Sequence, residues 1–86
     1  MSRMRRSKLE IIISILHAAM ENVNATHITY KANLSYSQLQ SYLKLLIKNG
    51  LIGVTEDAGG NRIYYTTPKG RLLIQHWEKV KDLLFI

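Results

Sequence analysis

Apolar positions recur at helical spacing over the first quarter of the chain. From residue 7 to about residue 22 they follow the i, i+3, i+4, i+7 rhythm that builds one face of a helix, at Leu9, Ile12, Ile13, Leu16, Ala19, Met20 and Val23. Ser7 suits the N-cap, and Glu10 completes a capping box. Because Ile11 and Ile15 lie off this stripe, the helix is apolar over more of its circumference than one core requires. Two interpretations stay open, namely deep burial in a small domain and a second surface for a partner chain.

Two further helices are predicted next. Thr26 or Asn24 can cap a short helix that runs to about residue 32, with Ile28 and Ala32 facing inward. After a turn at 33–34, Ser35 and Gln38 form a second capping box and open a third helix. We expect this helix to bury one stripe and to end at Gly50 in the left-handed conformation; the stripe is Leu39, Tyr42, Leu43, Leu46 and Ile47.

The remaining pattern predicts a hairpin and a last helix. Residues 52–56 and 62–66 have the character of strands, and 57–61 between them is rich in turn residues. Thr67 is a suitable cap for the last helix, with Pro68 at its first position. Gly70 lies early in this helix, where glycine costs up to about 1 kcal/mol relative to alanine. We therefore expect the helix to approach a neighbouring element closely at this position.

The order of elements is three helices, a hairpin and a helix, which is a mainly α fold with a small β-hairpin (α+β). Two helices joined by a short turn are typical of a helix-turn-helix, and the hairpin makes it a winged helix. With 86 residues, we expect one domain. Residues 1–6 would be a basic arm, 7–66 the winged-helix DNA-binding domain, and 67–86 a C-terminal dimerisation helix packed on that domain.

Charge indicates the class of partner. Lys and Arg number 12 against 6 Asp and Glu, a net charge of +6 that favours a polyanion, most often nucleic acid. The outward face of the third helix contains no acid within 35–49, unlike most solvated helix faces. Its candidate DNA contacts are base-edge donors and acceptors with phosphate-neutralising lysines, namely Tyr36, Ser37, Gln40, Ser41, Lys44 and Lys48.

The hairpin and the N-terminal arm add further candidate contacts. Arg62 can reach a groove or a phosphate, although Glu56 and Asp57 beside it leave an intraprotein salt bridge as the alternative. The basic arm contributes Arg3, Arg5 and Arg6. Such arms can lie along a groove, and a solvated tail is the alternative.

The last helix carries a heptad-like apolar seam. Leu73, Trp77, Val80 and Leu84 repeat with spacings of 4, 3 and 4, as in a coiled coil. We therefore expect a homodimer through this helix, against the alternative that it folds wholly onto its own domain.

Other classes of function have little support in the sequence. There is no cysteine, the three histidines lack metal-ligand spacing, and no phosphate-binding glycine motif or paired carboxylates occur. We expect no catalytic residue, no metal, no cofactor and no enzyme. Without a run of about 20 apolar residues, the expected location is cytoplasmic and nucleoid-associated, with no membrane partner.

Several stretches together resemble a known family. They are 6–12, Ile28 to Tyr36, the positions Leu39, Tyr42, Leu43 and Leu46, Gly50-Leu51, and Tyr65 to Gly70. This pattern is similar to the small archaeal winged helix-turn-helix proteins, which include predicted transcriptional regulators and basic chromatin-type DNA-binding proteins of Sulfolobus-like archaea. The resemblance implies DNA binding through 35–48 and dimerisation through an antiparallel coiled coil of the last helix, which is short here.

We therefore expect a dimeric winged helix that binds double-stranded DNA with helix 35–49 in the major groove, as a transcriptional regulator. A non-specific DNA-coating chromatin protein and a protein–protein interaction module are the alternatives.

Overall fold

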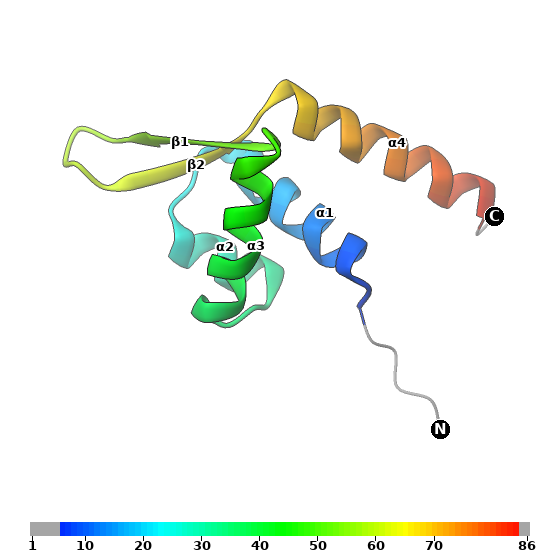
Figure 1. Ribbon diagram of the computed structural model, residues 1–86, viewed down its shortest axis with the longest axis horizontal. Coiled ribbons are helices and arrows are strands. Elements are labelled where there is room, and N and C mark those ends of the chain that lie inside the picture. The colour runs from blue at the N-terminus through cyan, green and yellow to red at the C-terminus, as the bar shows by residue number, and fades with distance from the viewer. Residues whose placement is uncertain (1–5, 85–86) are drawn as a thin grey trace.

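The computed structural model describes residues 6–84 and contains five helical segments and one hairpin. In chain order they are α1 (Lys8–Ala18), the 3₁₀ turn η1 (Ala19–Glu21), α2 (Ala25–Ala32), α3 (Tyr36–Lys48), β1 (Ile52–Glu56), β2 (Arg62–Thr66) and α4 (Pro68–Leu84). The hairpin projects to one side of α1–α3 and α4 extends to the other (Figure 1). The predicted fold class, mainly helical with a two-stranded antiparallel hairpin, is confirmed.

Local side-chain bonds fix where the helices begin. The Ser7 hydroxyl accepts a bond from the Glu10 N–H at 3.1 Å, and the Glu10 carboxylate accepts one from the Ser7 N–H at 2.8 Å. Ser35 and Gln38 form the same capping box at the start of α3. Asn24, one of the two predicted candidates, caps α2. Each such cap contributes about 1 kcal/mol, so the sequence encodes these helix starts locally.

The end of α3 is equally specific. The Leu51 N–H donates to the Leu46 carbonyl at 2.9 Å, and the Gly50 N–H donates to the Ile47 carbonyl at 3.0 Å. Gly50 has φ +72°, which completes a Schellman motif as the sequence predicts. This ending turns the chain from α3 directly into β1.

The core forms around α1, whose sides are covered by different elements. Ile15 is fully buried although it lies off the predicted stripe, since α2 and α4 both pack against this helix. The interpretation of deep burial is therefore correct for Ile15. The predicted inward positions of Leu9 and Met20 are wrong, because each is 38% exposed. Leu9 lies in the first turn, and Met20 lies in η1, where three residues per turn shift the helical phase.

The stripe of α3 also differs in part from the prediction. Leu39, Leu43 and Leu46 are buried and Tyr42 is half-buried. Ile47 is 40% exposed, so its predicted burial is wrong. It lies at the edge of the arc defined by the three leucines, where a side chain reaches the core only partly.

The base of the hairpin is bonded to the helical core. Tyr64 and Val23 exchange two backbone hydrogen bonds, with N···O distances of 2.7 and 3.0 Å. The buried Thr66 hydroxyl donates to the Leu16 carbonyl at 2.6 Å. The hairpin therefore leaves the core in a fixed direction, and we call this hairpin, residues 52–66, the wing.

A carboxylate organises the tip of the wing. One oxygen of Asp57 accepts bonds from the Gly59 and Asn61 N–H groups, both at 2.9 Å, and the other accepts from the Asn61 side chain at 3.2 Å. Gly60 has φ +82°, as the turn requires. The hydrogen bond from the Asn61 backbone, with those from its side chain and Gly59, lowers the pKa of Asp57 below its ordinary value.

At Gly70, α4 lies close to Leu51, Thr66 and Leu16. A Cβ at this position would overlap the Leu51 carbonyl oxygen and the Thr66 methyl group, and it would press on Leu16. The Gly70 N–H also donates to the Thr67 hydroxyl at 3.1 Å, which confirms the predicted cap. The close approach expected from the sequence is thus confirmed.

Replacing Gly70 with alanine should destabilise the protein by about 1–3 kcal/mol, because the added methyl group meets backbone that cannot move aside. Intrinsic helix propensity alone would act in the opposite direction by about 1 kcal/mol. Urea unfolding followed by circular dichroism measures the effect. Gln75→Ala, an exposed change on the same helix, should stay within about 0.5 kcal/mol; a stabilised Gly70→Ala variant would contradict the contact.

The Asp57 carboxyl should titrate below 3.8 when followed by NMR. The deprotonated form accepts the loop's hydrogen bonds, so their stabilisation is complete above the ordinary value and is lost as the pH falls through the lowered pKa. Asn61→Ala removes the side-chain bond and should move the midpoint back toward 3.8. A wild-type midpoint at or above 3.8 would show that these bonds are not formed in solution.

Candidate nucleic-acid interface

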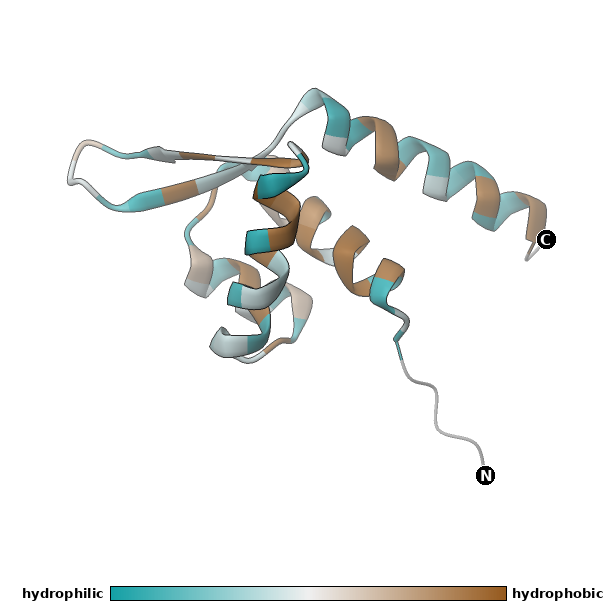
Figure 2. Cartoon of the chain, in the orientation of Figure 1, coloured by the Kyte–Doolittle hydropathy of each residue, from teal (hydrophilic) through white to brown (hydrophobic). Residues whose placement is uncertain are grey.

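The outward face of α3 is exposed along the helix. Ser37, Ser41, Lys44 and Lys48 are all exposed, on the side of the helix opposite its buried leucines. Figure 2 shows hydrophilic and near-neutral stretches along α3, whereas α1 is hydrophobic over most of its length. We call these four residues the outer face of α3. Its serines offer donors and acceptors and its lysines offer cations, without an acid between them.

The two predicted contact residues beside this face differ in their exposure. Tyr36 is 63% exposed at the first turn of α3. Gln40 is half-buried, and its amide nitrogen is buried without a hydrogen-bond partner among residues 6–84. A buried donor left unpaired costs about 1–3 kcal/mol. Turning this amide outward to an acceptor would therefore recover free energy.

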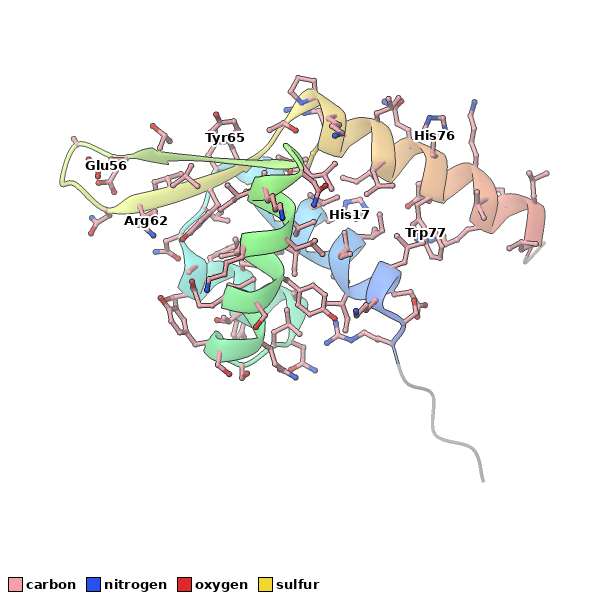
Figure 3. The ribbon with its side chains drawn as sticks, in the orientation of Figure 1. His17, Glu56, Arg62, Tyr65, His76 and Trp77 are labelled. Carbon is pink, nitrogen blue, oxygen red and sulfur yellow. The ribbon has the colours of Figure 1, made fainter. Side chains whose placement is uncertain are left out.

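Arg62 lies on the face of the wing that is continuous with the core. The register pairs Glu56 with Arg62 and Val54 with Tyr64, so Arg62 and the buried Tyr64 share one face. In Figure 3 Arg62 lies in the outer part of the wing and points to the side where α2 and α3 lie. Within residues 6–84 it forms no ion pair within 4.0 Å, so the alternative of an intraprotein salt bridge is wrong. Asp57 is instead bonded within its own loop.

On the opposite face of the wing, an aromatic ring packs over a glycine. Gly53 and Tyr65 are cross-strand partners, and a Cβ at Gly53 would overlap the Tyr65 ring. The ring therefore covers the glycine, as aromatic side chains do for glycines in sheets. This pair was not predicted from the sequence. The predicted hairpin does place Gly53 opposite Tyr65, and that pairing could have indicated the contact.

Arg6 has a contact that the sequence did not indicate. Its guanidinium donates to the carbonyls of Ala32 and Asn33, at 2.6 and 3.0 Å, where α2 ends. It thereby ties the start of α1 to the turn between α2 and α3. Arg3 and Arg5 lie outside the described residues.

One exposed aromatic residue of the helix-turn-helix was not among the predicted contacts. Tyr30 on α2 is 86% exposed, on the side of the helix away from the buried Ile28 and Ala32. Together with Tyr36 it flanks the turn between α2 and α3. In the sequence, the position of Tyr30 off the apolar stripe of α2 was the feature that indicated its exposure.

The residues of the predicted α4 seam lie in two different environments, one against the core and one exposed. Leu73 and Trp77 are half-buried against the core, and Figure 3 shows Trp77 pointing to α1, on the side of His17. Val80 and Leu84 are 42% and 67% exposed.

None of the helices in residues 6–84 combines the length and apolar character needed to cross a bilayer.

Two known proteins are similar to this chain in sequence. The chain is 34% identical over 82 residues to an uncharacterized protein of Methanocaldococcus jannaschii, and 41% identical over 51 residues to a second one. The two matches include 94% and 58% of this chain. They span only 36% and 53% of the length of the two relatives.

Two solved structures show the same fold. The DNA-binding protein Sso10a-2 of Sulfolobus solfataricus is 32% identical, with a TM-score of 0.79 over 91% of this chain and 81% of that one. A transcriptional regulator of the MarR family from Rhodococcus is 26% identical, with a TM-score of 0.74 over 85% of this chain and 54% of that one. The model of the winged helix-turn-helix family matches residues 5–85, and the chain therefore belongs to the winged helix-turn-helix family.

Proposed function

We propose that this protein binds double-stranded DNA as a winged-helix dimer and regulates transcription, with α3 in the major groove. The observation that carries the proposal is the exposed, acid-free outer face of α3. A helix fits the major groove, where serine and glutamine can read base edges and lysine can neutralise phosphates. The description of Sso10a-2 as a DNA-binding protein and of the Rhodococcus protein as a regulator supports the same function.

The charges around this face support an anionic partner. Lys44, Lys48 and Arg62 form no ion pair within 4.0 Å anywhere in the described chain, so their charges are available to phosphates. The wing leaves the core beside the end of α3 (Figure 1). This position supports a contact of Arg62 with the DNA backbone or the minor groove. Arg3 and Arg5 would extend the contact along the duplex.

The exposed apolar residues of α4 support the dimer. Leu72, Val80, Leu83 and Leu84 are between 42% and 78% exposed, which is an unusual run of bare apolar side chains for one helix. A second copy would cover them. Two recognition helices would then lie roughly 34 Å apart, one turn of duplex.

Binding of a labelled duplex should weaken steeply with salt. If each protomer neutralises about three phosphates, the slope of log K against log salt should be about −5. Titration by fluorescence anisotropy at several salt concentrations measures the slope. A flat response, or no binding at low salt, would contradict the proposal and favour a protein-interaction module.

Lys44→Ala should weaken binding to all duplexes and make the salt slope shallower by about 2, because one phosphate is no longer neutralised in each half of the dimer. Lys31→Ala is the matched control, because Lys31 is an exposed lysine beside His17 and Glu21, away from the outer face of α3. It should change the affinity less than about twofold. Equal decreases in affinity for the two variants would show that net charge alone determines binding.

Gln40→Ala should alter sequence preference in a selection of bound duplexes from a random pool. Removing one good base contact should cost about 1–3 kcal/mol on the preferred sequence and little on the rest. If the wild type enriches no sequence, or if the variant binds all of them equally more weakly, the DNA-coating function is favoured over a regulator.

A further inference from the structure

Two basic side chains of this protein are bonded to distant backbone carbonyls. The Arg6 guanidinium donates to the carbonyls of Ala32 and Asn33, at 2.6 and 3.0 Å. The Lys69 ammonium group donates to the Asn49 carbonyl at 2.8 Å. These bonds join residues that are 26, 27 and 20 positions apart in the sequence, so they fix how the elements lie against one another.

The bonded carbonyls lie on either side of α3. Ala32 is the last residue of α2 and Asn33 is the C-cap of that helix, two residues before the N-cap of α3. Asn49 is the C-cap of α3 itself. Arg6, just before α1, therefore holds the turn that leads into α3, and Lys69, in the first turn of α4, holds the point at which α3 ends.

Carbonyls at the end of a helix suit such partners. The last four carbonyls of a helix have no partner within it, and the helix dipole places partial negative charge there. A cation that donates to one of these carbonyls satisfies the acceptor and complements the dipole. The planar guanidinium presents several donors in a fixed fork, whereas the ammonium group is a point charge. Arg6 accordingly bonds two neighbouring carbonyls and Lys69 bonds one.

The turn held by Arg6 sets the direction of α3. Only residues 33–35 link α2 to α3, and Asn33 has φ +56°, in the left-handed region that few residues other than glycine adopt. The Leu34 N–H donates to the Thr29 carbonyl at 3.0 Å, which closes the end of α2. Because the link is so short, any change in its conformation changes the angle at which α3 leaves α2.

We propose that Arg6 and Lys69 are positioning residues, which hold the two ends of the recognition helix α3 and do not neutralise DNA phosphates. The inference rests on the DNA binding of the proposed function. It removes Arg6 from the DNA contacts expected from the sequence and gives both cations a task within the protein. Phosphate contact then depends on cations such as Lys44 and Lys48, which are exposed on the outer face of α3.

The surroundings of the two side chains support this division. Arg6 lines a groove between α1 and α4, together with Ser14 and Trp77. Lys69 lines a hollow between α4 and the end of α3, together with Leu72 and Leu73. No residue of the outer face of α3 lines either of these two depressions. Both cations therefore lie apart from the face that is proposed to enter the major groove.

Amide hydrogen exchange of the free protein, followed by NMR, tests whether each contact holds its helix end. Arg6→Gln should speed the exchange of the Leu34 N–H at least about threefold and leave that of the Leu51 N–H unchanged. Lys69→Gln should do the reverse, because the Leu51 N–H is bonded at the end of α3. Ile74→Val, a change in the buried core on α4, is the control for a general loss of stability and should affect both amides alike.

Titration of a labelled duplex at several salt concentrations separates positioning from phosphate contact. Arg6→Gln and Lys69→Gln should each weaken binding at least about fivefold, if α3 is correctly directed in only about a fifth of the molecules. The slope of log K against log salt should stay within about 0.5 of the wild-type value, because no phosphate contact is lost. Lys44→Ala should instead make it shallower by about 2. Lys69→Arg, which keeps a donor for the same carbonyl, should restore most of the affinity.

Several results would overturn the inference. Unchanged exchange of Leu34 in Arg6→Gln, or of Leu51 in Lys69→Gln, would show that the residue does not hold that end of α3. A slope about 2 shallower for either glutamine variant would show that its cation neutralises a phosphate. Unchanged affinity in both variants, or an equal loss of affinity in Ile74→Val, would exclude positioning as the cause.

Failure of the proposed function has a different signature. A wild-type protein that binds no duplex at low salt would overturn the DNA binding itself, and with it the part that Arg6 and Lys69 play in it. The exchange rates of Leu34 and Leu51 are measured without DNA, so they would still decide whether the two cations hold the ends of α3.

Discussion

The junction between β2 and α4 is the constraint on which the rest of the structure depends. At this point the Thr66 hydroxyl donates to the Leu16 carbonyl, the Thr67 hydroxyl donates to the Gly50 carbonyl, and Gly70 approaches the Leu51 carbonyl too closely for a side chain. α1, the end of α3, the wing and α4 thus converge within a few residues. Because buried polar groups must be satisfied, the Thr66 bond fixes one arrangement of these elements.

This junction sets the directions of the wing and of α4. The wing starts from it toward one side, and α4 starts from it toward the other (Figure 1). Lys69 strengthens the same region, since its ammonium group donates to the Asn49 carbonyl at the end of α3 at 2.8 Å. The orientation of α3 relative to the wing and to α4 is therefore held by hydrogen bonds of Thr66, Thr67 and Lys69 at this junction.

The exposed sides of α3 and α4 differ in chemistry because the two helices pack against the core in different ways. α3 buries a narrow stripe of leucines and leaves the opposite side polar and basic, which suits a polyanion. α4 buries little beyond Gly70 and Ile74 and leaves an apolar side bare, which suits a protein surface. A chain of 86 residues buries only a small core, so cover from a second copy would add stability as well as symmetry.

The sequence by itself determined the elements of this protein and the boundaries of most of them. Capping boxes at Ser7 and Ser35, the Schellman glycine at Gly50 and the turn residues 57–61 act within a few residues, so their effect can be read locally. The polar, acid-free outer face of α3 follows from the same periodicity. Even the close approach at Gly70 was indicated, because glycine is otherwise unfavourable near the start of a helix.

Only the tertiary structure decided which side chains these elements use against one another. The burial of Ile15, the exposure of Leu9 and Ile47, and the hydrogen bonds of Arg6 to the end of α2 depend on how neighbouring elements lie, which no local pattern encodes. The same holds for α4, where a heptad spacing cannot tell a seam that faces the chain's own core from one that faces solvent. Trp77 points to α1 and His76 points away from it, because the close approach at Gly70 turns that side of α4 toward the core.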